Sequence, residues 1–404
     1  MNPQSCIACG KSGGLACTGC LLAFDSQHSI FKAVYCSKEC QTAHWPQHKA
    51  FCTSRKAVGR AAFLLRDLFL LYKDFSYSDC LIQLREENGI LYSILGDHDE
   101  DATKGRTIIR QFPRELAPAV EDYQAYLMMQ ECSFIFSTFK CIVDFILDPI
   151  CRQIDEVEVY TRNVHRPVVV MQSGNLTSGM LKNHYLLRVK LPSGEDVAVD
   201  LTGAQFGWKE PVSPWAAWED QRAYGAVTTH YRGYISDSKE DQDEKYKIAS
   251  TWYGKVRPVW EGQIKAMLGA IVGTIKKQQP GTNGSVAKFL RSRDYDDARS
   301  EMMKAARKSL AACLHEVLVS NTMRMYWTPE WEYQVTVTKA QSEHLKKVWL
   351  SDAEYEENKH DVSLLNDIWM RRCLDKKIVD GWLPLGLCIS SEHSVEELIR
   401  LHAA

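Results

Sequence analysis

Seven cysteines and His48 form four closely spaced pairs near the start of the chain. A Cys-x-x-Cys pair on a tight turn can bring both thiolates to one metal ion at about 2.3 Å. In a pair with three intervening residues, both ligands share one face of a helical turn. Eight ligands suffice for two tetrahedral zinc sites. The pairs are Cys6 with Cys9, Cys17 with Cys20, Cys36 with Cys40, and His48 with Cys52.

Metal binding explains this cluster better than disulfides do. The remaining seven of the 14 cysteines are scattered singly, and the odd number in the cluster is completed by a histidine. The first residues show no basic and apolar signal pattern, so we expect an intracellular protein of the cytoplasm or nucleus. A disulfide-rich secreted module is the competing interpretation. A site closed by four protein ligands leaves no position for substrate, which predicts structural zinc.

The ligand pattern resembles the MYND-type zinc finger, including that of fungal proteins. All eight ligand positions occur in order over residues 6–52, with Tyr35 just before the fifth. The stretch from Cys20 to Cys36 is longer than is common in the family and predicts an enlarged loop. The resemblance implies a cross-braced arrangement, in which the first and third pairs bind one zinc ion and the second and fourth pairs bind the other. His44 is a rival ligand, but the family pattern favours His48.

The charge of the finger argues against nucleic acid as its main ligand. In residues 1–56, six basic and two acidic side chains, two zinc ions and seven thiolates leave a net charge of +1, too little for binding to phosphates. The family resemblance implies contacts with proteins instead, often with proline-rich peptides. It places Thr18, Gln41 and Trp45 in a peptide groove, although Trp45 could equally pack in the small core beside the zinc.

The rest of the chain predicts an α+β fold, mainly helical with two β-hairpins. We expect a finger over 1–56, an α+β domain over 57–235 and a helical region over 246–404 that packs on it. Apolar runs are too short to cross a membrane. The predicted hairpins are 80–95, with a turn at Asn88-Gly89, and 185–201. The predicted helices are 57–72, 115–147, 215–223, 246–278, 285–320 and 340–379, and a buried strand is expected at 168–171.

One polar pair in the second hairpin could do chemistry. An antiparallel pairing would bring His184 close to Asp200, and Gln205 follows just beyond. This layout looks like the hairpin of transglutaminase-like and other papain-fold enzymes, where a histidine activates a cysteine. Cys132 and Cys141 are expected inside an apolar helix and Cys151 at its far end, so no nucleophile fits.

We therefore expect His184 to be an ordinary surface residue, with no catalytic residues in the chain. The favoured function is a zinc-binding protein–protein interaction adaptor. The alternative is a cysteine hydrolase or transglutaminase-like enzyme, active or degenerate, that uses His184 and Asp200.

Overall fold

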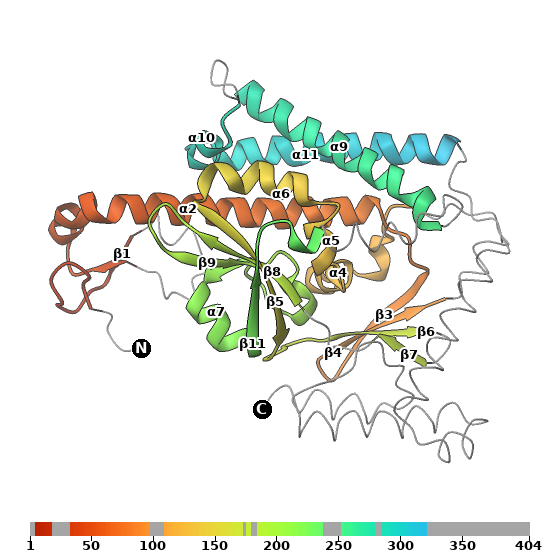
Figure 1. Cartoon of the computed structure of the whole chain (residues 1–404), viewed down its shortest axis with the longest axis horizontal. Helices are drawn as coiled ribbons and strands as arrows, with labels where there is room; N and C mark the ends of the chain where they lie inside the picture. The colour runs from red at the N-terminus through yellow and green to blue at the C-terminus, as the bar shows by residue number, and fades with distance from the viewer. Residues whose placement is uncertain are drawn as a thin grey trace, which may run out of the picture.

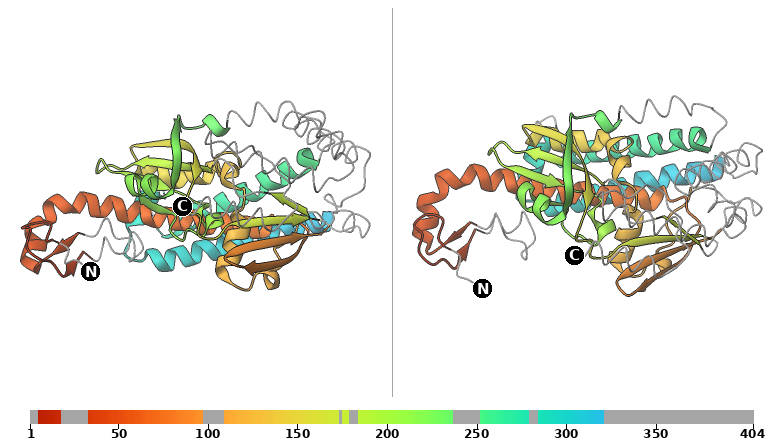
Figure 2. Two further views of the ribbon diagram at one scale, coloured as in Figure 1. Left: turned by 90° about the horizontal axis from the view of Figure 1, so that it is seen from below. Right: turned by 60° about the horizontal axis from the view of Figure 1, so that its bottom comes forward.

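The computed structural model describes residues 5–17, 33–96, 109–172, 175–178, 184–236, 252–278 and 284–320. Helix α2 (Lys38–Phe75) runs through the middle of the molecule, with other helices along one side and the sheets on the other (Figure 1). The finger lies at the N-terminal end of α2, beyond the body, in each view of Figure 2. The α+β class predicted from the sequence is confirmed.

Helix α2 begins inside the finger and ends inside the body. Its N-terminus is capped by Ser37, whose side chain accepts a hydrogen bond from the N–H of Cys40. Pro46 lies within the helix, where it removes one backbone hydrogen bond. The helix predicted from residue 57 is confirmed but is the second half of a longer element, so the expected domain boundary at residue 56 lies within α2.

Three further helices cover α2 from one side. Helices α9 (Trp252–Gln278) and α11 (Tyr295–Ser320) pack against each other, and α10 (Val286–Arg291) packs on α2. Arg60 of α2 joins these elements, because its guanidinium donates to the carbonyl oxygens of Leu290 and Ser292 at 2.9 and 2.8 Å. The hydroxyl of Tyr295 donates to the carbonyl oxygen of Arg60 at 2.9 Å, so α2 and the helical layer are joined by both apolar packing and partly buried polar contacts.

The larger sheet has five antiparallel strands, in the order β10-β9-β8-β5-β11. The predicted second hairpin forms its centre, with Leu187 opposite Val199. One helix, α7 (Trp215–Arg222), lies between β10 and β11 in the chain. The strands are β5 (Gln153–Thr161), β8 (His184–Lys190), β9 (Asp196–Val199), β10 (Val212–Pro214) and β11 (Ala223–His230).

A second sheet has four strands, in the order β3-β4-β6-β7. Its first two strands are the predicted hairpin, and the turn residues Asn88 and Gly89 have φ of 53° and 80°, as a type I′ turn requires. The predicted buried strand at 168–171 is β6, which pairs in parallel with β4. The strands are β3 (Leu81–Glu87), β4 (Ile90–Leu95), β6 (Val168–Gln172) and β7 (Asn175–Ser178).

The predicted helix over 115–147 is wrong as a single element. The chain there turns repeatedly, and Gln130 interrupts the helical path because its φ is +61°. Residues 115–147 instead form three helices, α4 (Val120–Met128), α5 (Cys132–Phe136) and α6 (Lys140–Leu147).

The body also contains three 3-10 helices among its described residues, η1 (Arg114–Leu116), η2 (Asp148–Ile150) and η3 (Gly203–Phe206).

Three strands of the large sheet, β5, β10 and β11, were not predicted, and the predicted helix over 340–379 lies outside the described residues. No helix among the described residues is both long and apolar enough to cross a membrane.

The main core joins α2 to the neighbouring helices and to the five-stranded sheet, whereas the four-stranded sheet packs in separate clusters. Leu68 is fully buried in α2 and belongs to the cluster that also contains residues of α6, α9, α11 and the five-stranded sheet. We predict that Leu68→Ala lowers the free energy of unfolding by about 2–5 kcal/mol, measured by urea denaturation. Ile82→Ala is the control, since Ile82 is 60% exposed and should change stability by less than about 0.5 kcal/mol. Equal effects of the two substitutions would contradict this assignment of the core.

Candidate functional site

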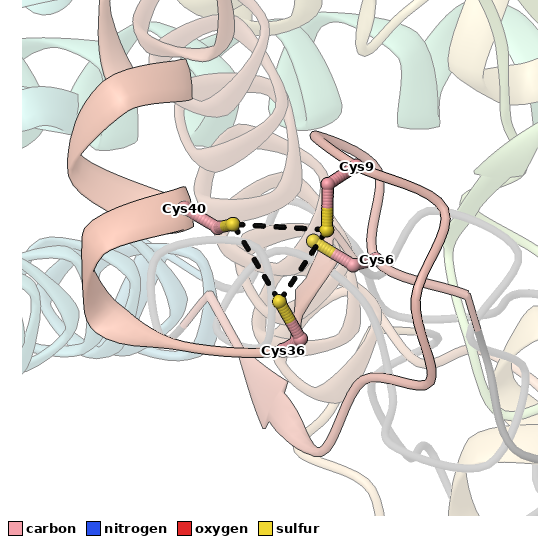
Figure 3. Close-up of side chains that lie close together, drawn as sticks. All are labelled: Cys6, Cys9, Cys36 and Cys40. Atoms are coloured by element: carbon pink, nitrogen blue, oxygen red, sulfur yellow. Dashed lines mark hydrogen bonds between the residues drawn. The ribbon is translucent and has the colours of Figure 1, made fainter.

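Four cysteines from two separate stretches of chain converge at the tip of the finger (Figure 3). Cys6 and Cys9 come from the N-terminal loop, while Cys36 precedes α2 and Cys40 lies in its first turn. Their sulfur atoms all lie within 4.8 Å of one another. This grouping is the one expected for the first and third ligand pairs.

The spacing of the sulfur atoms fits a tetrahedral zinc site. The Sγ of Cys36 lies 3.5 Å from those of Cys9 and Cys40, and the Sγ atoms of Cys9 and Cys40 are 3.8 Å apart. Zinc–sulfur bonds of about 2.3 Å place the sulfurs of a tetrahedron about 3.8 Å apart. The separations are much longer than a disulfide bond of about 2.05 Å, so the donors are arranged for a metal.

The finger contains a second group of ligands. Cys17, His48 and Cys52 bring their donor atoms within 4.8 Å of one another, and the sulfurs of Cys17 and Cys52 are 3.8 Å apart. All three residues are buried. The fourth predicted ligand, Cys20, lies outside the described residues. Two thiolates and an imidazole at this spacing match the preference of zinc.

His44 is engaged elsewhere. Its Nδ1 lies 3.1 Å from the hydroxyl of Tyr35, and its ring stacks on that of His48 with centroids 6.0 Å apart. His44 is absent from both ligand groups of the described residues. The hydrogen bond to Tyr35 therefore supports the packing around the ligand His48.

The backbone of the finger brings the ligand pairs together by a short antiparallel ladder. Strands β1 (Leu15–Ala16) and β2 (Val34–Tyr35) pair in it. Gly10 has a φ of +77°, which suits glycine in the turn after Cys9. At Gly13 a Cβ atom would lie 2.7 Å from Cγ1 of Val34, so a larger residue would push the strands apart.

Comparison with known families supports this geometry. Residues 6–52 match the sequence model of the MYND finger. This segment is a MYND finger. Its two ligand groups are those of a protein that binds two zinc ions. Comparisons of the whole chain with curated proteins and with solved structures gave no match.

Two of the three residues predicted to form a peptide groove, Gln41 and Trp45, lie on α2. Trp45 is 41% exposed and rests one edge on His48, with ring centroids 6.0 Å apart. Gln41 lies one turn before it, and both line a hollow of about 550 Å³. Thr18 lies outside the described residues. The hollow also receives Arg291 from α10, a residue that the sequence did not suggest because it is remote in the chain.

His184 and Asp200 form a buried pair in the five-stranded sheet. The Nε2 of His184 lies 3.0 Å from Oδ2 of Asp200, and the side chains are 0% and 1% exposed. The expectation that His184 is an ordinary surface residue was wrong. That expectation followed from the position of His184 at the start of a hairpin strand. In the structure β5 pairs along the other edge of β8, so β8 is an inner strand of the sheet. Aromatic side chains close the space around the imidazole: Phe206, Trp208 and Trp218.

Cys132 was also misplaced by the sequence analysis. It is the first residue of α5, whereas we expected it inside a long apolar helix. Helix α5 packs on β8, and Cys132 is close enough to His184 to raise the pKa of its imidazole. Cys141 is on α6, and Cys151 follows η2.

The surroundings of the pair favour charges on both partners. Burial alone lowers the pKa of His184, but Asp200 and Cys132 outweigh it and raise that pKa to about 9. Burial alone raises the pKa of Asp200, but the nearby His184, and then Arg222, lower it below its usual value. A charged imidazole and carboxylate therefore stabilise each other in the folded state.

The ligand assignment predicts that replacing one cysteine ligand lowers the amount of bound zinc. Cys36→Ser removes one ligand from the four-sulfur group, so the purified protein should retain about one zinc ion in place of two, since the site then lacks a tetrahedral ligand set. Zinc release on denaturation, followed with a colorimetric chelator, measures this. Cys141→Ser is the matched control, because Cys141 lies on α6 and should leave the zinc content unchanged. Full zinc content in Cys36→Ser would refute the ligand assignment.

The buried pair predicts a pH-dependent stability. Because the pKa of His184 rises from 6.5 to about 9, its contribution is complete below pH 6.5 and is lost as the pH rises through 9. Because the pKa of Asp200 falls below 3.8, its contribution is complete above that value and is lost on acidification. The Asp200→Asn variant should therefore be less stable than the wild type by on the order of 3 kcal/mol in free energy of unfolding near pH 5–6. The accompanying difference in Tm should be largest there and should shrink above pH 9. A difference independent of pH would contradict the charged pair.

Proposed function

We propose that the protein is an adaptor that binds other proteins through its MYND finger. Fingers of this family are associated with protein–protein contacts, often with proline-rich peptides. The zinc thiolates also require a reducing environment, which favours an intracellular role in the cytoplasm or nucleus. The single observation that carries the proposal is the hollow beside the second zinc group.

The hollow follows one face of α2. Gln41, Trp45 and Lys56 lie on this face, and the zinc ligands Cys17 and Cys52 lie against it. An exposed indole beside a depression is a suitable platform for a polyproline segment, which loses little conformational entropy on binding. The zinc ions would contribute by fixing the residues around the hollow and not by contacting the ligand, because four protein ligands are expected at each ion.

The charge of the hollow suggests which peptides would bind. Three of the described residues that line it are basic, namely Lys38, Lys56 and Arg291, and none is acidic. Arg291 is held near α2 by the contacts of Arg60 with the α10 segment. A proline-rich peptide with flanking acidic residues complements both the indole and these cations.

The groove predicts that Trp45 is essential for peptide binding. Trp45→Ala should weaken binding of a fluorescent proline-rich, glutamate-flanked peptide at least about tenfold, because buried aromatic anchors dominate such interfaces. Fluorescence anisotropy with an array of such peptides measures this. Phe51→Ala is the matched control, since Phe51 is also an exposed aromatic on α2, at 38%, and does not line the hollow. Tight binding that survives Trp45→Ala would refute the groove assignment.

A further inference from the structure

The hollow beside the second zinc group extends beyond the MYND finger into the body. Its lining residues on α2 run from Lys38, the first residue of the helix, to Lys56, which lies past the last residue of the family match, Cys52. At about 1.5 Å per residue this stretch of helix is about 27 Å long. A polyproline segment rises about 3.1 Å per residue, so the hollow is long enough for a peptide of about nine residues. Trp45 therefore contacts only part of such a peptide, and the remainder reaches the body.

Two cations lie together at the end of the hollow that is formed by the body. Arg291, the last residue of α10, lines the hollow together with Lys56. The backbone on both sides of Arg291 is fixed, because the guanidinium of Arg60 donates to the carbonyl oxygens of Leu290 and Ser292. Arg60 follows Lys56 by four residues and shares its face of α2. These contacts hold Arg291 beside the helical turn that carries Lys56.

Both cations are available to an anionic ligand. Arg55, which directly precedes Lys56, is bound to Glu195 of the body, with its Nε 3.0 Å from Oε1. Among the described residues, by contrast, neither Lys56 nor Arg291 takes part in an ion pair, and no acidic side chain lines the hollow. Two like charges on one surface repel each other, so an anion bound between them gains from both.

A phosphate group matches this pair of cations better than a carboxylate does. A phosphorylated serine or threonine carries a charge of about −1.5 to −2 at pH 7, which nearly balances Lys56 and Arg291 together. A guanidinium can donate two parallel hydrogen bonds to phosphate oxygens, and a lysine ammonium adds a compact point charge. A glutamate side chain carries a single charge and would leave one of the two cations without compensation.

The position of the cations determines the spacing required within the peptide. Lys56 lies about 16 Å beyond Trp45 along α2, a distance that a polyproline segment covers in about five residues. Exposed charges are screened over about 8–10 Å at physiological ionic strength, so a phosphate directly beside Trp45 would gain little from Lys56. At the opposite end of the hollow, Lys38 is the one basic side chain among the described lining residues.

We infer that Lys56 and Arg291 form a phosphate subsite, which binds a phosphoserine or phosphothreonine about five residues from the proline that contacts Trp45. The inference rests on the proposed function, because it requires a peptide bound in the hollow. It adds the class of partner, namely a proline-rich protein that a kinase has phosphorylated. Both residues of the subsite lie outside the family match, so the body of the chain selects the phosphorylated form. Phosphorylation of the partner therefore strengthens its binding.

The test uses the full-length, zinc-loaded protein and fluorescent peptides that contain a short proline run. Phosphoserine is placed about five residues before the prolines in one series and after them in another, because a polyproline segment can run in either direction along α2. Fluorescence anisotropy compares each peptide with its unphosphorylated form. In one of the two series, we expect phosphorylation to tighten binding at least about tenfold. Glutamate at that position, or phosphoserine directly beside the prolines, should tighten binding by about threefold or less.

Two pairs of variants identify the groups that bind the phosphate. Arg291→Ala should remove most of the gain from phosphorylation and leave the affinity for the unphosphorylated peptide within about twofold, because an exposed charge-assisted contact is lost without a change in packing. Arg293→Ala is its matched control, since Arg293 is also exposed and does not line the hollow. Lys56→Ala should likewise reduce the gain, whereas Lys49→Ala should not, because Lys49 is an exposed residue of α2 that does not line the hollow.

The outcomes distinguish failure of the subsite from failure of the proposed function. If unphosphorylated peptides bind through Trp45 but phosphorylation adds no affinity in either series, the adaptor function stands and the phosphate subsite is refuted. Equal effects of Arg291→Ala and Arg293→Ala, or equal gains from glutamate and phosphoserine, would also overturn the subsite. Absence of binding by every peptide would contradict both the subsite and the proposed function.

Discussion

Helix α2 is stabilised at its two ends by different physical forces. At its N-terminus it contains zinc ligands from both groups, and a finger of this size cannot bury enough apolar surface to fold without metal. Toward its C-terminus it supplies a fully buried apolar face to the main core. The helix therefore makes the finger, which depends on metal, and the body, which depends on packing, parts of one continuous element. The helical layer and the five-stranded sheet both pack against the same core that this helix crosses.

The features that the sequence predicted are those with local causes. The zinc ligands are recognised by spacing, and Asn88-Gly89 specifies its turn by backbone preference alone. The contacts of Cys132 could not be predicted in this way, because Gln205, which fixes the turn before it, lies 75 residues from Gln130. The apolar residues over 115–147 favour one long helix, but tertiary contacts divide this segment into the three helices α4, α5 and α6. Strand β11 was missed because most of its residues are exposed or partly exposed and lack an apolar face.

Buried polar groups in the body act as long-range specifiers of its topology. Glu156 is fully buried in β5 and accepts hydrogen bonds from the N–H groups of Gly233 and Ile235 at 2.7 and 2.9 Å. These bonds fix the chain beyond β11, just as the pair of His184 and Asp200 joins β8 to the turn after β9. Misplacing any of these partners leaves a charge buried without compensation, which costs several kcal/mol. Apolar packing alone discriminates much less between alternative arrangements of the strands.

The continuity of α2 also has a mechanical consequence. From Pro46 to Phe75 the helix extends for roughly 45 Å at about 1.5 Å per residue, and no loop interrupts it. A partner bound to the finger would thus be held at a fixed distance and orientation relative to the body by the continuous helix. A flexible tether would instead let it sample many orientations. Within α2, Pro46 has no backbone N–H to donate to the helix, and it directly follows Trp45, so this missing hydrogen bond lies beside the aromatic platform.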